Sequence, residues 1–169
     1  KMFSTMLGYE GMLEPNSTVL TGNLVVKGGG DPTLGSLWFK DQLPPDSIFR
    51  KWINGLKLKG IAKITGNLVI DASAYHGEGV PGSWSWEDLG NYYGAGPTAL
   101  SFNDNMVRLY FDSSAKPGEP ARLVRTDPSL PGITWKNEVK SSTVNRDLAY
   151  VFGSPWGEIR KITGSIPSG

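Results

Sequence analysis

The stretch that decides the fold runs from Gly79 to Asn105 and reads GVPGSWSWEDLGNYYGAGPTALSFNDN. It contains two Trp, two Tyr and one Phe, but its apolar residues follow neither the period of a helix nor that of a strand. Gly, Asn and Pro favour turns within it. A loop of this length in a compact domain is usually functional or packed on its own side chains. Its aromatic residues are therefore expected to pack the loop, to bind a ligand, or to do both.

Upstream of this loop, strand patterns surround one helix. Apolar residues favour strands over residues 3–13, 19–27 and 64–70. Residues 47–58 instead have apolar side chains at helical spacing, and the expected buried stripe consists of Ile48, Phe49, Trp52, Ile53 and Leu56. Asp46 is expected to cap the first turn of this helix.

Downstream of the loop, the pattern changes to short strands. Residues 106–111 alternate in polarity, and further strand signals separated by turns continue to residue 166. No helical pattern fits this part of the sequence. We therefore predict a strand-rich α+β fold with an α+β unit over residues 1–102 and an all-β unit over residues 103–169.

One short motif occurs more than once. Thr21–Val26 reads TGNLVV and Thr65–Ile70 reads TGNLVI, while Lys161–Gly164 repeats the KITG of Lys63–Gly66. The spacings are large and unequal, which argues against a solenoid. We interpret each copy as a turn that leads into a strand.

The composition excludes several classes of function. The net charge is +1, which is too small to favour nucleic acid or an anionic membrane as partner. No apolar run approaches the roughly 20 residues of a membrane span, and the N-terminal residues do not resemble a signal peptide. There is no Cys and one His, His76, which leaves no disulfide, thiolate or Cys-based zinc site. His76 is expected at the surface.

Three short strings resemble the motifs of serine acyl transfer. Ser113–Lys116 spells S-x-x-K, but that chemistry needs Ser and Lys one turn apart on a helix, and Pro117 opposes helical geometry at Lys116. Thr143–Asn145 and Lys161–Gly164 only approximate the partner motifs. We interpret all three as coincidental and expect no catalytic residue in this chain.

Two further segments could suggest a bound cofactor. Gly28–Thr33 follows a strand but lacks the ending of a phosphate-binding loop, and Pro32 blocks entry into a helix. Asp31 and Asn103–Asn105 are oxygen donors without the ligand spacing of a calcium loop. They are expected to bond to turn backbones, so no metal and no cofactor is expected.

A resemblance to a known family covers nearly the whole chain. It rests on LTGNLVVKGGGDPTL at Leu20–Leu34, GNLVID at Gly66–Asp71, and the Pro-Gly…Trp-Ser-Trp-Glu-Asp string within Pro81–Asp88. Tyr93-Gly94-Ala95 and Ala99-Leu100…Asn103-Asp104-Asn105 extend it. In these motifs the chain is similar to the low-molecular-mass class C penicillin-binding proteins, which are D-alanyl-D-alanine carboxypeptidases and endopeptidases.

The resemblance implies a non-catalytic role. In that family, two extra domains are inserted into the penicillin-binding domain between its first and second catalytic motifs, and this chain resembles the insertion alone. Its implied partners are the missing penicillin-binding domain of the same polypeptide and the peptidoglycan stem peptide. The implied location is periplasmic or otherwise extracytoplasmic, and the implied function is to shape the substrate cleft.

The resemblance also implies a substrate-binding residue. The family places an acidic residue ahead of the Pro-Gly…Trp string to meet the free amine of the stem peptide, and Glu78 holds that place here, with Glu where Asp is expected. Trp84 and Tyr92 are further binding candidates because they are aromatic residues of the loop, not because the family assigns them. A solvated loop carboxylate is the alternative for Glu78. For the chain, the alternatives are a free-standing carbohydrate-binding module using Trp84, Trp86 and Tyr92, or a pure interaction domain.

Overall fold

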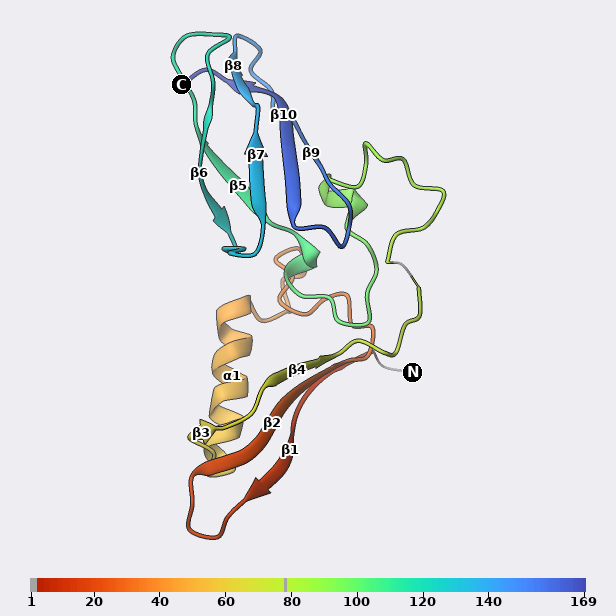
Figure 1. Cartoon of the computed structure of the whole chain (residues 1–169), viewed down its shortest axis with the longest axis vertical. Coiled ribbons are helices and arrows are strands. Elements are labelled where there is room, and N and C mark those ends of the chain that lie inside the picture. Colours follow the sequence, from red (N-terminus) through yellow and green to blue (C-terminus); the bar gives the residue numbers. More distant parts are fainter. Residues whose placement is uncertain (1–2, 78) are drawn as a thin grey trace. The chain divides into compact units, whose positions relative to one another are not determined.

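The computed structural model describes residues 3–77 and 79–169 (Figure 1). The chain forms two compact units. The first contains the described residues of Lys1–Glu78 together with Pro97–Asn105, and the second contains Gly79–Gly96 together with Met106–Gly169. The described residues hold one α-helix and ten strands, which confirms a strand-rich α+β fold. Whether residues 1–102 and 103–169 fold independently stays a prediction.

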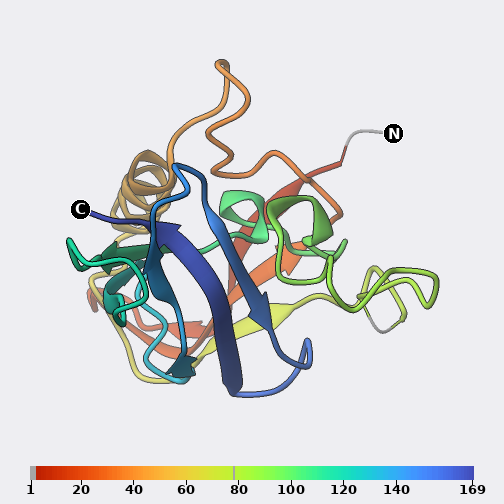
Figure 2. The same ribbon diagram turned by 90° about the horizontal axis from the view of Figure 1, so that it is seen from above.

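The first unit is built on a sheet in which β2 is the central strand. β1 (Thr5–Leu13) pairs with β2 (Val19–Gly28) in antiparallel orientation. β3 (Lys63–Ile64) and β4 (Leu68–Asp71) both run parallel to β2. A parallel neighbour needs a crossover connection, and α1 (Pro45–Leu58) supplies it between β2 and β3. Figures 1 and 2 show α1 beside this sheet.

The repeated TGN motif is a pairing device of this sheet. The two copies bring their strands into register, so that Leu24 lies opposite Leu68 and Val26 opposite Ile70. The amide of Asn67 donates to Oδ1 of Asn23 (2.9 Å), and the amide of Leu24 donates to the carbonyl of Asn67 (2.9 Å). The second copy therefore starts a strand as expected, but the strand expected over residues 64–70 is divided into β3 and β4 by this turn.

Helix α1 differs from the prediction at its start and on its apolar side. The residue before it is Pro44, with no side-chain cap, so the expected cap by Asp46 is wrong; Asp46 lies in the first turn. A carboxylate is still favoured there by the helix dipole. Of the expected stripe, Ile48 is buried and Trp52 and Leu56 are half-buried, whereas Phe49 and Ile53 are exposed to 45% and 49%.

The three glycines after β2 are explained by packing of backbone on backbone. A side chain at Gly28 would collide with the carbonyl of Ala99, and one at Gly29 with the carbonyl of Ser4. Gly30 has a positive φ of 82°, and its amide donates to the carbonyl of Ala99 (2.8 Å). Gly28 and Gly30 thus hold residues 97–105 within the first unit, and Gly29 permits the close approach of Ser4.

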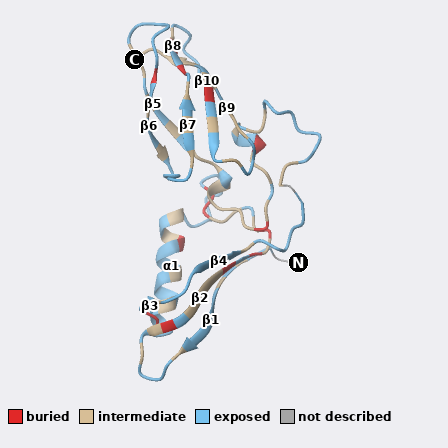
Figure 3. Ribbon diagram, viewed as in Figure 1, coloured by how far each residue is buried: buried red, intermediate tan, exposed pale blue. Residues whose placement is uncertain are grey.

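The second unit packs a two-stranded hairpin against a four-stranded sheet. The hairpin consists of β5 (Arg108–Asp112) and β6 (Arg122–Asp127). In the sheet, β10 (Ile159–Pro167) has β9 (Leu148–Phe152) on one edge, antiparallel, and β7 (Thr134–Asn137) and β8 (Lys140–Ser142) on the other, both parallel. The core contains Ala121, Val139 and Ile162, with partly buried side chains from both sheets around it. Figure 3 shows buried positions in β2 and β10.

The first and third copies of the motif do not start strands. Thr21–Asn23 lies inside β2 and Lys161–Gly164 lies inside β10, so their interpretation as turns that lead into a strand is wrong. Gly164 has a positive φ of 103°, and a side chain there would collide with the carbonyl of Leu148 on β9. The glycine is therefore required by strand pairing.

Candidate functional site

The loop Gly79–Gly96, named here the aromatic loop, belongs to the second unit. Its first part extends away from the strands of that unit (yellow-green in Figures 1 and 2). It then forms the short 3-10 helix η1 (Tyr92–Gly94). Four backbone hydrogen bonds shape it. The amide of Trp84 donates to the carbonyl of Pro81 (3.0 Å), that of Asp88 to Ser85 (3.0 Å), that of Asn91 to Asp88 (3.0 Å), and that of Gly94 to Asn91 (2.9 Å).

Glycines hold the aromatic loop close to other backbone. A side chain at Gly90 would collide with the carbonyl of Val151 on β9, and one at Gly94 with the carbonyl of Asp88. Gly96 approaches the carbonyl of Gly79 in the same way, at the two ends of the loop. Only glycine permits these approaches, so the second half of the loop is fixed on the edge of β9.

A hydrogen bond fixes the exposed ring of Tyr93. The hydroxyl of Tyr93 donates to Oδ1 of Asp88 (3.1 Å), and the ring packs edge-to-face on Tyr92 with centroids 5.2 Å apart. Partial desolvation, followed by the hydrogen bond and charge of Asp88, raises the pKa of Tyr93, and Tyr150 and Tyr92 add to this effect. The loop therefore presents a positioned phenol ring beside β9.

We predict that Asp88→Asn lowers the pKa of Tyr93. The side-chain amide of Asn still accepts a hydrogen bond but carries no charge, so it no longer repels the negative phenolate form of Tyr93. Desolvation of the phenolate remains, and the pKa of Tyr93 should therefore stay above its usual value of about 10. An NMR pH titration of isotope-labelled tyrosine measures it. The pKa of Tyr93 is higher in the folded than in the unfolded chain. The stability that Tyr93 contributes is therefore fully present below its unfolded-state pKa, and it is lost as the pH rises through its folded-state pKa.

The matched control for this prediction is Glu87→Gln. It removes a neighbouring exposed carboxylate of the same loop that makes no contribution to the shifted pKa of Tyr93. An equal fall in both variants would show that the general charge of the loop, and not the bond to Asp88, controls the phenol.

The three predicted substrate-binding residues differ in what the structure says of them. Glu78 lies outside the described residues. Trp84 is 36% exposed in the extended part of the aromatic loop, and Tyr92 is 69% exposed on η1. Trp86 is also exposed. Both candidate rings are thus accessible, and their role in substrate binding stays a prediction.

The strings that resemble acyl-transfer motifs lack the geometry for that chemistry. Ser113–Lys116 connects β5 to β6 without forming a helix, and the amide of Lys116 donates to Oγ of Ser114 (3.2 Å). Thr143–Asn145 follows β8 in a bend, and Lys161 forms an ion pair with Glu138 (2.8 Å). These positions do not assemble a nucleophile and a base.

The expected turn roles of the oxygen donors are confirmed for two of them. Oδ1 of Asp31 accepts from the amide and the hydroxyl of Thr33 (2.9 and 2.8 Å), and Oδ1 of Asn105 accepts from the amide of Phe102 (3.1 Å). His76 is exposed, as expected. Within residues 3–77 and 79–169, no three His, Asp or Glu side chains gather as potential metal ligands. None of the helices in that part of the chain has the length and apolar composition to cross a membrane.

Sequence reasoning missed Asp88 as the partner of Tyr93 and Gly90 as the contact with β9. The spacing of Asp88 and Tyr93 could have predicted their hydrogen bond, because a carboxylate and a phenol five residues apart can meet across a turn. Gly90 carried none, since the need for glycine arises from β9, which is about 60 residues away in the sequence.

Comparison with known proteins gives matches over the entire chain. The sequence model of the D-Ala-D-Ala carboxypeptidase 3 (S13) family matches residues 1–169. D-alanyl-D-alanine carboxypeptidase DacB of Haemophilus influenzae is 32% identical over 125 residues, which are 72% of this chain and 23% of that protein. Penicillin-sensitive carboxypeptidase A of Dictyostelium discoideum is 33% identical over 119 residues, 65% of this chain and 21% of that protein.

Solved structures share the fold. A crystal structure of penicillin binding protein 4 (dacB) from Haemophilus influenzae matches 99% of this chain with a TM-score of 0.70 at 23% identity, and the match covers 34% of that chain. A second crystal structure of that protein, in complex with a β-lactam, matches with a TM-score of 0.58 at 21% identity and 31% coverage. The matches thus span between 21% and 34% of the length of each relative.

Proposed function

Because the chain belongs to the D-Ala-D-Ala carboxypeptidase 3 (S13) family, we propose that it is a non-catalytic region of a larger serine-type D-alanyl-D-alanine carboxypeptidase or endopeptidase. One observation carries this proposal. The family match covers residues 1–169, yet the chain spans only 23% and 21% of the two relatives compared by sequence. The remainder of the parent polypeptide would hold the penicillin-binding domain, act on peptidoglycan stem peptides, and work in the periplasm or elsewhere outside the cytoplasm.

The absence of an assembled nucleophile supports the non-catalytic part of the proposal. Serine acyl transfer needs a Ser and a Lys held together on a rigid element. Among the described residues, the Ser-x-x-Lys string lies in a non-helical connection, and Lys161 is engaged by Glu138. Catalysis is therefore assigned to the missing domain.

The role that we assign to this chain is to shape the substrate cleft with the aromatic loop and the residue before it. A carboxylate at Glu78 suits the ammonium group of a stem peptide, because charge-assisted hydrogen bonds are the strong ones. Trp84 and Tyr92 offer exposed rings within 14 residues of it, which suit the apolar stem of the same side chain.

We predict that the isolated chain forms no covalent adduct with a fluorescent penicillin, whereas the full-length parent does. The expected result follows from the missing nucleophile, and denaturing gel electrophoresis measures it. The control is Ser113→Ala in the isolated chain. A band on the isolated chain that this substitution abolishes would mean that Ser113–Lys116 is an acyl-transfer site after all.

A further inference from the structure

One face of the four-stranded sheet in the second unit is not covered by the β5–β6 hairpin. Trp135 of β7 and Val151 of β9 pack against the core, and Ser141 of β8 and Ile162 of β10 are buried. Successive residues of a strand point to opposite faces. The residues next to them therefore point outward. This outer face contains Lys136, Lys140, Tyr150, Lys161 and Thr163, together with the half-buried Leu148 and Phe152 of β9.

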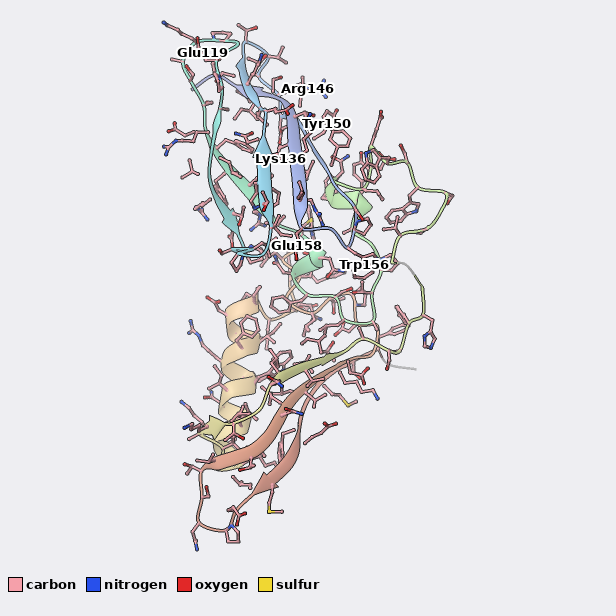
Figure 4. The ribbon with its side chains drawn as sticks, in the orientation of Figure 1. Glu119, Lys136, Arg146, Tyr150, Trp156 and Glu158 are labelled. Carbon is pink, nitrogen blue, oxygen red and sulfur yellow. The ribbon has the colours of Figure 1, made fainter. Side chains whose placement is uncertain are left out.

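The strand register places these side chains side by side. Lys161 lies opposite Lys136 on β7, and Thr163 lies opposite Tyr150 on β9. In the antiparallel pair, Thr163 and Tyr150 therefore have Cβ atoms about 4.5–5.5 Å apart. Figure 4 shows Lys136 and Tyr150 on the strands that flank β10. An aromatic ring, a hydroxyl and lysine side chains thus share one continuous surface.

The outer face is positively charged. It carries three lysines, Lys136, Lys140 and Lys161, and one carboxylate, Glu138, which pairs with Lys161 at 2.8 Å. Three positive charges and one negative charge leave a net charge of +2 on the sheet, and the carboxylate of Asp88, which bonds to Tyr93 at the edge, lowers it to +1. The lysine side chains are exposed, so a negatively charged ligand can reach them.

The aromatic loop extends this surface at the edge of β9. Tyr150 is 43% exposed and precedes Val151, whose carbonyl the loop approaches at Gly90, and it is one of the groups that raise the pKa of Tyr93. Contact of Gly90 with the carbonyl of Val151 and the bond from Tyr93 to Asp88 fix this arrangement. The phenol ring of Tyr93 is therefore held at the surface before a ligand binds, which lowers the entropy cost of binding.

We propose that this outer face, with Tyr93 at its edge, binds a sugar chain that bears carboxylates, such as the glycan strand of peptidoglycan. The C–H faces of pyranose rings pack on aromatic rings, while sugar hydroxyls bond to Tyr and Thr hydroxyls. The lysines complement the carboxylates. The choice of peptidoglycan rests on the proposed function, whereas the choice of an anionic saccharide rests on the surface itself. A net charge of +1 is small for a nucleic-acid surface, where many phosphates are contacted.

The test is an NMR titration of the isotope-labelled 169-residue chain with two tetrasaccharides. One alternates N-acetylglucosamine and N-acetylmuramic acid and carries no stem peptide; the other, chitotetraose, has no carboxylate. We expect the first to shift the amide resonances of β7, β9 and β10 and to bind more tightly, with an advantage that salt reduces. Because no stem peptide and no catalytic domain is involved, failure here would leave the proposed cleft function unaffected.

Matched variants show whether saccharide binding depends on the outer face or only on the number of exposed rings and charges in the chain. Tyr150→Ala should weaken binding about tenfold, as expected for an aromatic residue at the centre of a binding surface. Tyr9→Ala, which removes a ring of equal exposure (42%) from β1 in the first unit, should have no effect. Lys136→Ala and Lys161→Ala should each cost about two- to fivefold at low salt, whereas Lys51→Ala on α1 should cost nothing.

Several results would overturn the proposal. These are no binding of either tetrasaccharide, equal binding of both, or equal losses in Tyr150→Ala and Tyr9→Ala. Self-association of the chain that Tyr150→Ala abolishes, seen by sedimentation in the absence of saccharide binding, would assign the face to a second copy of the chain instead.

Discussion

Glu78→Gln in the full-length parent is expected to lower kcat/KM about tenfold or more for stem peptides with a free side-chain amine. A hydrogen bond to a charged group in a partly closed cleft is worth ~1.5–3 kcal/mol, and ~1.4 kcal/mol corresponds to a factor of ten. For peptides whose amine is acetylated, kcat/KM should be unchanged, because no ammonium group remains for the carboxylate to bind. Steady-state kinetics on paired free and acetylated peptides measures both.

Glu87→Gln is the matched control for this experiment. Glu87 is an exposed carboxylate in the aromatic loop, nine residues after Glu78, so its removal changes the local charge equally. Equal losses on free and blocked amines in Glu78→Gln would mean that Glu78 supports the loop and does not recognise the substrate. Unchanged kcat/KM on both peptides in Glu78→Gln would mean that Glu78 is a solvated carboxylate. An equal loss of kcat/KM in Glu87→Gln would mean that long-range charge, and not a bond from Glu78, causes the effect.

The elements of this fold that depend on local pattern were predictable from the sequence. The helix was found because its apolar residues recur at helical spacing, and β1 and β2 were found because strand patterns lie between turn residues. The sequence shows the repeated TGN motif, but it does not show that two copies of the motif pair with each other. Its two copies bond to each other across parallel strands, and parallel pairing over more than 40 residues leaves no local signature.

The predictions for α1 are wrong where contacts with distant parts of the chain determine the helix start and the burial of its side chains. Asp46 has the side chain of a helix cap, but Pro44 occupies the position before the helix, so Asp46 enters the first turn. The apolar pattern predicts five buried residues on α1, yet Phe49 and Ile53 remain half exposed. Periodicity gives the side of a helix that is apolar, but the width of the surface that covers it is set by distant segments.

The candidate site was predictable only as a loop. The density of Trp, Tyr and Gly marked residues 79–105 as unusual, and the family resemblance pointed to Glu78. The outer face of the second unit could not be found in this way. Lys136, Tyr150 and Lys161 come from three strands, and only their register brings them together. Parity along one strand predicts which residues share a face, but not which strand is the neighbour.

Two core substitutions should reveal whether the chain contains two folding units. Ile162 and Leu20 are both fully buried, the first in the core of the second unit and the second in β2 of the first unit. Truncation of a buried Leu or Ile to Ala costs about 2–5 kcal/mol, a large part of the roughly 5–15 kcal/mol that stabilises a domain. If each unit has its own core, each variant should destabilise only its own unit.

Native-state amide hydrogen exchange measures this by residue, which a single melting temperature cannot do for two units. In Ile162→Ala, protection should fall in β7–β10 and persist in β1, β2 and α1; in Leu20→Ala, the reverse should hold. The exchange of the aromatic-loop amides shows where the boundary between the two folding units lies. If residues 1–102 fold together, its amides should lose protection with Leu20→Ala, but if the contact of Gly90 with Val151 governs, they should follow Ile162→Ala. Loss of protection throughout the chain in both variants would contradict two units and indicate one cooperative domain.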